Sequence, residues 1–245
     1  MKSPLKNKNL FVCVMLFAVS AFCSGGPIAF SKVKVEPVFV NPPSAQYRNA
    51  PSFATKVTTA NRWLMIKVEY TPPLEKQPLP VLVGRKKDDR NLKVNTYIDD
   101  VELKVNVLLS TGLTDGRNML YANYNGTAKF WTIRLDGNKH LALMYLPAVL
   151  IDRYCGKQRV AGAGKAVLKD FHIEAEFFHN GSMIGRGYYN VDGSEQQARK
   201  KFRMMLNSVP KKMVLNNAVL SHRNSPWALL NPDSLDLEKP ASQDR

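Results

Sequence analysis

Three ionisable side chains, His172, Glu174 and Glu176, alternate along a stretch with the periodicity of a β-strand. Alternate residues on a strand project from one face and lie roughly 6.6–7 Å apart. An imidazole and two carboxylates at that spacing suit zinc or manganese. The residues between them are apolar and supply an inward face, so we expect the three polar side chains to face solvent. We therefore predict no metal site and no cofactor.

Two further patterns fall short of an active site. The segment 162–165 resembles the end of a phosphate-binding loop, but Arg159 stands where that loop needs glycine and Ala166 where it needs serine or threonine. The chain has no Gly-x-Ser-x-Gly elbow, and no histidine has an acid and a nucleophile at motif spacing. We predict no catalytic residues, and the chain is not expected to be an enzyme.

Basic residues outnumber acidic ones, with 35 Lys and Arg against 20 Asp and Glu and a net charge of +15. Residues 153–169 and 199–223 contain several basic side chains and no acid. Such segments attract polyanions or anionic membrane surfaces, and the alternative is a surface that only solubilises the protein. The candidate binding residues are Arg199, Lys200, Lys201, Arg203, Lys211 and Lys212. No signature of a nucleic-acid-binding module accompanies them, so we do not expect nucleic acid as a partner.

The first 24 residues have the three parts of a secretory signal. Three lysines precede an apolar run from Leu10 to Phe22, and small residues follow before Gly25. The run is shorter than the about 20 residues that span a bilayer. An uncleaved anchor and a lipid on Cys23 are the alternatives. We predict an exported protein of the periplasm, the outer membrane or the cell surface. Removal of the leader would remove its three lysines, and the remaining 32 basic and 20 acidic residues give a net charge of +12.

The rest of the chain has mostly strand periodicity. Residues 25–60 form a Pro-rich arm in which Val33–Val40 is a predicted edge strand. Apolar and polar residues alternate in 62–70, 97–109, 129–135 and 167–179, and Trp131 is expected to share a face with Ile133. Dipeptides such as Asn125-Gly126 and Asn180-Gly181 predict hairpin turns between strands. This pattern predicts an antiparallel β-sandwich of about seven to nine strands over residues 61–225, followed by a polar tail over 226–245.

One amphipathic helix is predicted near the C-terminus. Ser194 followed by Gln197 is a capping box, and Pro210 ends the helical pattern. Its apolar stripe consists of Ala198, Phe202, Met205 and Leu206. Basic residues occupy much of the remaining helix surface. A shorter segment, Ala148 to Tyr154, fits either a strand or a helix.

The layout resembles an exported, immunoglobulin-like protein of Gram-negative gut bacteria that is associated with type IV pilus gene clusters. The resemblance covers about residues 60–220 and rests on the leader, the Pro-rich arm, the strand Arg62–Tyr70 and the basic C-terminal helix. It implies an immunoglobulin-like sandwich, although the disulfide between the sheets is missing. A pilin leader ends in glycine and precedes a long apolar helix, whereas Gly25-Gly26-Pro27 leads into prolines and strands here. The resemblance therefore implies an accessory component and not the major fibre subunit.

We therefore expect a non-enzymatic extracytoplasmic structural or interaction protein. Its partners would be other envelope or pilus-associated proteins, bound through sheet edges, loops and the basic helix. One alternative is a protein whose basic surface binds a polyanion, an anionic glycan or a membrane surface. A second, less favoured alternative is a metal-dependent hydrolase. The oligomeric state is left open.

Overall fold

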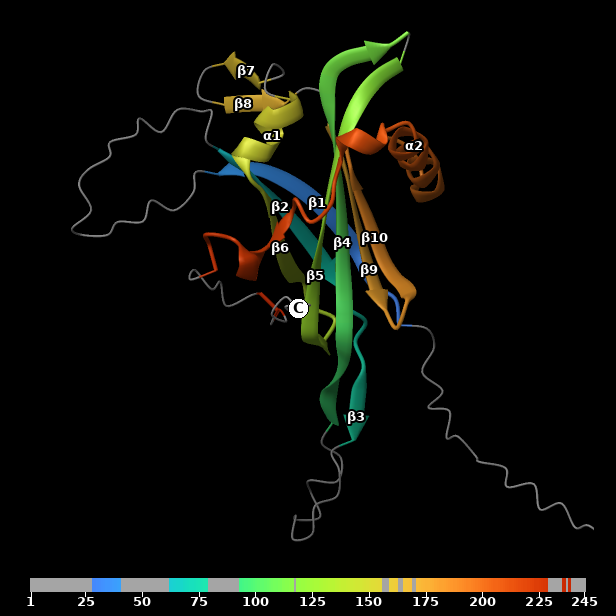
Figure 1. The fold of residues 1–245 in the computed structure, drawn as a ribbon. Helices are drawn as coiled ribbons and strands as arrows, with labels where there is room; N and C mark the ends of the chain where they lie inside the picture. Colours follow the sequence, from blue (N-terminus) through green and yellow to red (C-terminus); the bar gives the residue numbers. More distant parts are fainter. Residues whose placement is uncertain are drawn as a thin grey trace, which may run out of the picture.

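The computed structural model describes residues 28–40, 62–78, 93–116, 118–155, 159–162, 165–168, 171–228, 235–236 and 238. The predicted leader, much of the Pro-rich arm and most of the polar tail lie outside these residues. Within them, strands form two packed sheets, with two α-helices beside the larger sheet (Figure 1). The prediction of a mainly β protein with a sandwich architecture is confirmed.

The smaller sheet contains the predicted edge strand of the N-terminal arm. In the described residues its strand order is β1 (Ser31–Val40), β2 (Trp63–Thr71), β6 (His140–Leu146) and β12 (Leu220–Ser221), and all neighbours are antiparallel. Val35 of β1 lies opposite Val68 of β2. The edge strand of the arm thus pairs with the body of its own chain.

The larger sheet is built around two long strands. In the described residues its order is β10 (Ser182–Tyr189), β9 (Phe171–His179), β4 (Lys93–Asp115), β5 (Asn118–Leu135) and β11 (Val214–Leu215), and β3 (Lys76–Pro78) pairs with β4. The pairing of β11 with β5 is parallel, whereas the other pairs of this sheet are antiparallel. β7 (Arg159–Gly162) and β8 (Lys165–Leu168) form a separate small antiparallel pair.

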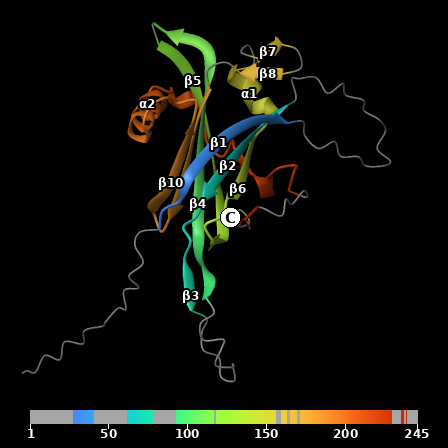
Figure 2. The ribbon, with the colours of Figure 1, turned by 180° about the vertical axis from the view of Figure 1, so that it is seen from behind.

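Two helices flank the larger sheet, as the opposite views in Figures 1 and 2 show. The ambiguous segment after β6 is helix α1 (Ala148–Cys155). Helix α2 (Glu195–Asn207) begins with the predicted capping box, in which Ser194 Oγ accepts from the Gln197 amide and Gln197 Oε1 accepts from the Ser194 amide. Two short 3₁₀ turns follow, η4 (Lys211–Met213) and η5 (His222–Asn224). Among the described residues, no helix is long and apolar enough to cross a membrane.

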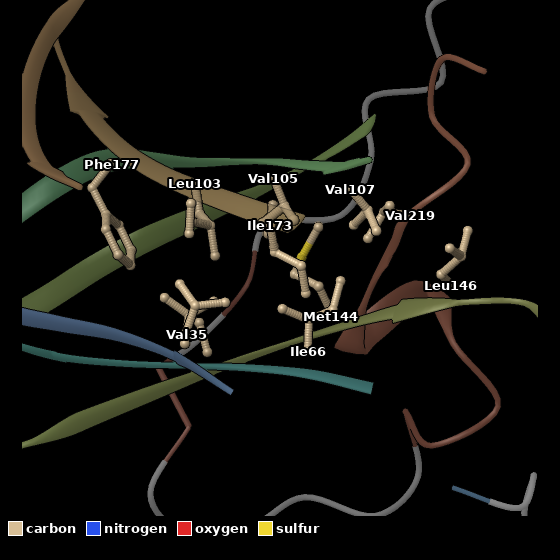
Figure 3. Packing of buried hydrophobic residues seen from close by; sticks show 14 of the residues in the cluster. Val35, Ile66, Leu103, Val105, Val107, Met144, Leu146, Ile173, Phe177 and Val219 are labelled. Atoms are coloured by element: carbon tan, nitrogen blue, oxygen red, sulfur yellow. The ribbon is translucent and has the colours of Figure 1, made fainter. Parts of the chain in front are cut away.

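The core lies between the two sheets, where the alternating apolar residues meet (Figure 3). Leu103, Val105 and Ile173 of the larger sheet and Ile66 and Val35 of the smaller one are buried. Burying an aliphatic side chain of this size contributes about 1.5–3 kcal/mol. The strand periodicity therefore predicted the correct inward face of β4 and β9, because that face is the one that leaves water.

The strand predicted to end at Asn125-Gly126 continues through this dipeptide as part of β5, so the predicted hairpin turn is wrong. The Asn125 carbonyl oxygen accepts from the amides of Ala218 and Val219 at 2.8 and 3.0 Å, and the Asn125 side chain accepts from the Asn217 amide at 3.1 Å. A side chain at Gly126 would clash with the Val219 carbonyl. Asn125-Gly126 is thus the place where a distant loop docks against a continuous strand.

Candidate functional site

Two of the three alternating residues of β9, Glu174 and Glu176, do not face solvent, so the expectation is wrong for these two, whereas His172 is partly exposed. Glu174 is fully buried and Glu176 is 5% exposed, because α2 packs over this side of the larger sheet. His172 is turned to a different partner, since its Nδ1 donates to the Asn190 carbonyl at 2.6 Å. Within the described residues, no three His, Cys, Asp or Glu side chains gather as metal ligands would.

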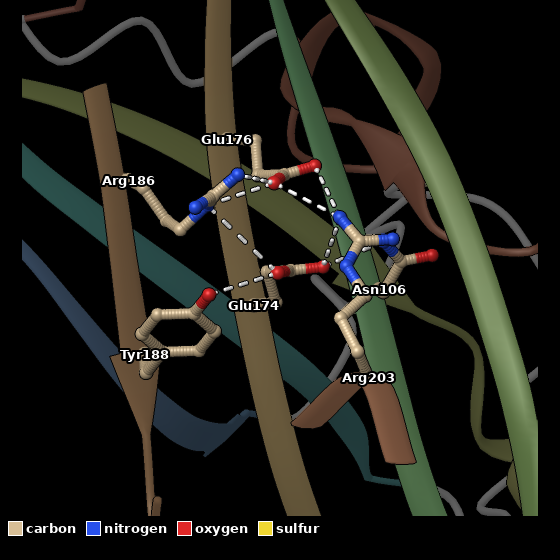
Figure 4. Close-up of polar contacts among 6 residues, drawn as sticks. All are labelled: Asn106, Glu174, Glu176, Arg186, Tyr188 and Arg203. Carbon is tan, nitrogen blue, oxygen red and sulfur yellow. Dashed lines mark hydrogen bonds and ion pairs between the residues drawn. The ribbon is translucent and has the colours of Figure 1, made fainter. Parts of the chain in front are cut away.

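The two glutamates form a cluster with two arginines from neighbouring elements (Figure 4). Arg186 of β10 donates to Glu176 Oε1 from Nε at 2.8 Å and from Nη2 at 2.5 Å. Arg203 of α2 donates from Nη2 to both oxygens of Glu176, at 3.1 and 3.3 Å. We call Glu174, Glu176, Arg186, Tyr188, Arg203 and Asn106 the arginine–glutamate cluster. It connects α2 to strands β4, β9 and β10.

Glu174 is the most deeply buried member of this cluster. The Tyr188 hydroxyl donates to its Oε1 at 3.1 Å, Asn106 Nδ2 donates to its Oε2 at 3.3 Å, and Arg203 Nη2 lies 3.5 Å from Oε2. Burial raises the pKa of the Glu174 carboxyl, and the negative charge of Glu176 raises it further, against the opposing effect of the arginines and of Tyr188. Each carboxylate oxygen of the pair thus has a protein partner.

The cluster balances two carboxylates against two guanidinium groups, and both carboxylates are at most 6% exposed in their side chains. Arg186 is 6% exposed in its side chain, whereas Arg203 is 42% exposed and lies at the rim. Such an arrangement holds elements together, since breaking a buried pair leaves an uncompensated charge. Its chemical role here is to fix α2 on the sheet.

The six predicted binding residues separate into two groups. Arg203 is drawn into the arginine–glutamate cluster, so its charge is already paired. The other predicted residues, Arg199, Lys200, Lys201, Lys211 and Lys212, are exposed on α2 and η4. Lys201 Nζ donates to the Asp192 carbonyl at 3.1 Å, which keeps its charge near the start of the helix.

A second charged group, which the sequence patterns did not reveal, lies at the start of β6. His140 Nε2 is 3.1 Å from Asp136 Oδ1, and His140 Nδ1 is 3.0 Å from each carboxylate oxygen of Asp236. The Tyr70 hydroxyl donates to Asp236. Burial lowers the pKa of His140, but the two carboxylates outweigh that effect and raise it. The spacing of Asp136 and His140 was visible in the sequence, whereas the contact with Asp236 exists only in the fold.

The larger sheet also carries a projecting hairpin, which we define as Thr111–Leu120. β9 pairs with β4 only over Val101–Leu109, and in the described residues Thr114 and Asp115 pair only with Met119 and Asn118. Leu113 is 57% exposed and Met119 is 36% exposed. The hairpin extends beyond both sheets at the end where α1 and α2 lie (Figure 1).

No protein-family model matches this chain, and no curated protein matches it significantly. A crystal structure of a protein from Akkermansia muciniphila is similar, with a TM-score of 0.54 and 14% sequence identity. The match covers 88% of this chain and 95% of that chain. At this identity the likeness concerns the fold, and it extends over nearly the whole length of both proteins.

Proposed function

We propose that this chain is an exported, non-enzymatic interaction protein of the bacterial envelope, and that it serves as an accessory component of a type IV pilus-like system. The observation that carries the interaction role is the projecting hairpin, which leaves the sandwich and exposes Leu113 and Met119. The pilus assignment is supported by the resemblance in layout described above. The partner is accordingly an envelope or pilus-associated protein.

The physical argument concerns what stabilises such a hairpin. A two-stranded ribbon without a third strand or a covering helix is marginally stable in water. Leu113 stays 57% exposed and Met119 36% exposed, so part of their apolar surface is still in contact with water in the folded sandwich. A partner that covers them would bury apolar surface and pair with the strand edges that have no neighbour among the described residues. The ionisable residues on β9, by contrast, are already used to hold α2 in place.

The test uses two double variants in the bacterium that carries the gene, each as the only copy. L113S/M119S makes the hairpin polar, and M183S/M204S changes two exposed methionines elsewhere as the matched control. A second hairpin variant replaces residues 112–119 with the turn dipeptide Asn-Gly. Thr111 and Leu120 can be joined in this way because the Thr111 hydroxyl already donates to the Leu120 carbonyl. We expect fewer surface pili by electron microscopy with both hairpin variants and normal piliation with the control. Normal piliation with the shortened hairpin would refute the proposal.

A further inference from the structure

We infer that α1, η4 and α2 form one continuous basic surface at the base of the projecting hairpin, and that this surface binds a linear anionic polysaccharide. The basic band, as we call it, consists of Arg153, Arg199, Lys200, Lys201, Lys211 and Lys212, all of them exposed. It uses different residues from the hairpin tip, so it goes beyond the interaction role proposed above.

The fold brings together the two acid-free stretches of the sequence. The Tyr154 hydroxyl of α1 donates to the Lys212 carbonyl of η4 at 3.0 Å. The Arg153 guanidinium lies over the Tyr154 ring, 5.4 Å from its centroid. Tyr154 therefore links Arg153 to the backbone of Lys212, although Arg153 and Lys212 are far apart in the chain. The band passes from α1 to η4 through this contact.

The link from α2 to η4 is the short segment 208–210, and each end of it is held by a hydrogen bond to its own element. The Ser208 amide donates to the Met204 carbonyl at 3.2 Å, and the Met213 amide donates to the Pro210 carbonyl at 2.8 Å. These bonds hold the end of α2 and the start of η4 in fixed positions. Lys211 and Lys212 therefore lie just beyond the C-terminal end of α2, the helix that carries Arg199, Lys200 and Lys201.

The charge of the band is not balanced by its own elements. Helix α1 carries Asp152 and helix α2 carries Glu195, against the six cations of the band. Arg203 is excluded from this count because Glu176 pairs with it. Cations spaced along a surface raise the local concentration of a polyanion and bind it through several weak contacts at once.

The geometry favours a polymer over a membrane. A helix that binds a bilayer presents its apolar face to the lipid, but the apolar residues Ala198 and Phe202 of α2 are buried against the sheet. Figures 1 and 2 show α1 and α2 on opposite sides of the base of the hairpin. A flexible chain can follow the band around that base, whereas a flat bilayer cannot contact both sides together.

The experiment compares two triple variants of the full-length protein with the same loss of charge. R153Q/K211Q/K212Q removes cations from the band, and K34Q/K129Q/K139Q removes exposed lysines elsewhere. Heparin is the probe, and binding is measured by titration at several salt concentrations. Exposed ion pairs each change affinity by about threefold, so the band variant should lose about tenfold or more and the control less than about twofold. The affinity of the wild-type protein should fall as salt rises.

Three outcomes would overturn this inference. The first is that the wild-type protein fails to bind heparin. The second is that both triple variants lose affinity for heparin equally, which would indicate that net charge alone determines binding. The third is that the protein binds vesicles of anionic phospholipid but not heparin. The hairpin variant L113S/M119S keeps the whole band and should bind heparin normally. Loss of the polysaccharide site and loss of the interaction role are therefore separate results.

Discussion

Replacing Arg186 with methionine is the sharpest test of how α2 is held on the sheet. Arg186 is 6% exposed, and two of its nitrogens lie 2.8 and 2.5 Å from Glu176 Oε1. Methionine retains the apolar stem of the side chain and removes both donors. Glu176, whose side chain is also 6% exposed, would then depend on Arg203, which also lies close to Glu174.

The magnitude follows from burial. Removing one partner of a buried ion pair costs about 3–5 kcal/mol, because the other charge stays buried and unpaired. Arg203 remains within 3.1 and 3.3 Å of Glu176, so we expect the lower end, about 3 kcal/mol. For a domain of this size that corresponds to a fall in melting temperature of about 6–12 °C. Arg203→Met should cost only about 1 kcal/mol, since Arg203 is 42% exposed and screened by water.

The assay is urea unfolding followed by circular dichroism, with R203M, E176Q and E176Q/R186M beside R186M. Glu176→Gln removes the charge that R186M leaves unpaired, so the double variant should be less destabilised than the sum of the two single changes. Hydrogen exchange of the α2 amides should rise in R186M, because the cluster connects that helix to the sheet. The reasoning is refuted if R186M loses less than about 1 kcal/mol or no more stability than R203M.

Two other predictions concern single sites. G126A should lower the free energy of unfolding by about 3 kcal/mol, because the new methyl group would clash with the Val219 carbonyl. Strand β5 is paired with β4 and β11 and cannot easily move away. An unchanged thermal midpoint would contradict the docking described for β5. For His140, burial lowers the pKa but Asp236 and Asp136 raise it by more, so its protonated form stabilises the folded state below the unfolded pKa of about 6.5. That contribution disappears as pH rises through the higher folded-state pKa. The stability advantage of the wild-type protein over H140Q should therefore shrink from about pH 6 upward in urea titrations, and an advantage independent of pH would show that the imidazolium is not stabilised by the two carboxylates.

Local patterns predicted the inward face of two strands and the hairpin turn at Asn180-Gly181 correctly. The alternation in residues 97–109 and 167–179 identified the inward residues Leu103 and Ile173, which are fully buried. Asn180 and Gly181 have φ values of 49° and 76°, as a two-residue hairpin turn requires. These features depend on neighbours in the chain, so the residue types alone predict them.

Other features depended on segments far away in the sequence. Trp131 was expected to share a face with Ile133, but Trp131 is 53% exposed and Ile133 is fully buried. The neighbouring strand contains Asp100 at a φ of 56°, and near this point the alternation of β5 changes phase. Asn125-Gly126 has the composition of a turn and became a docking point for Val219. Periodicity does not report such contacts between distant residues.

The sequence alone determined which residues of each strand are apolar, and therefore which face of the strand turns away from water. A predicted leader and a basic surplus were equally visible there. The tertiary structure alone decided that α2 covers the outer face of β9, so Glu174 and Glu176 are buried with arginines and do not meet solvent. Hydrophobic burial follows the local period of a strand, whereas an ion pair depends on the distance in space between residues that only the fold brings together.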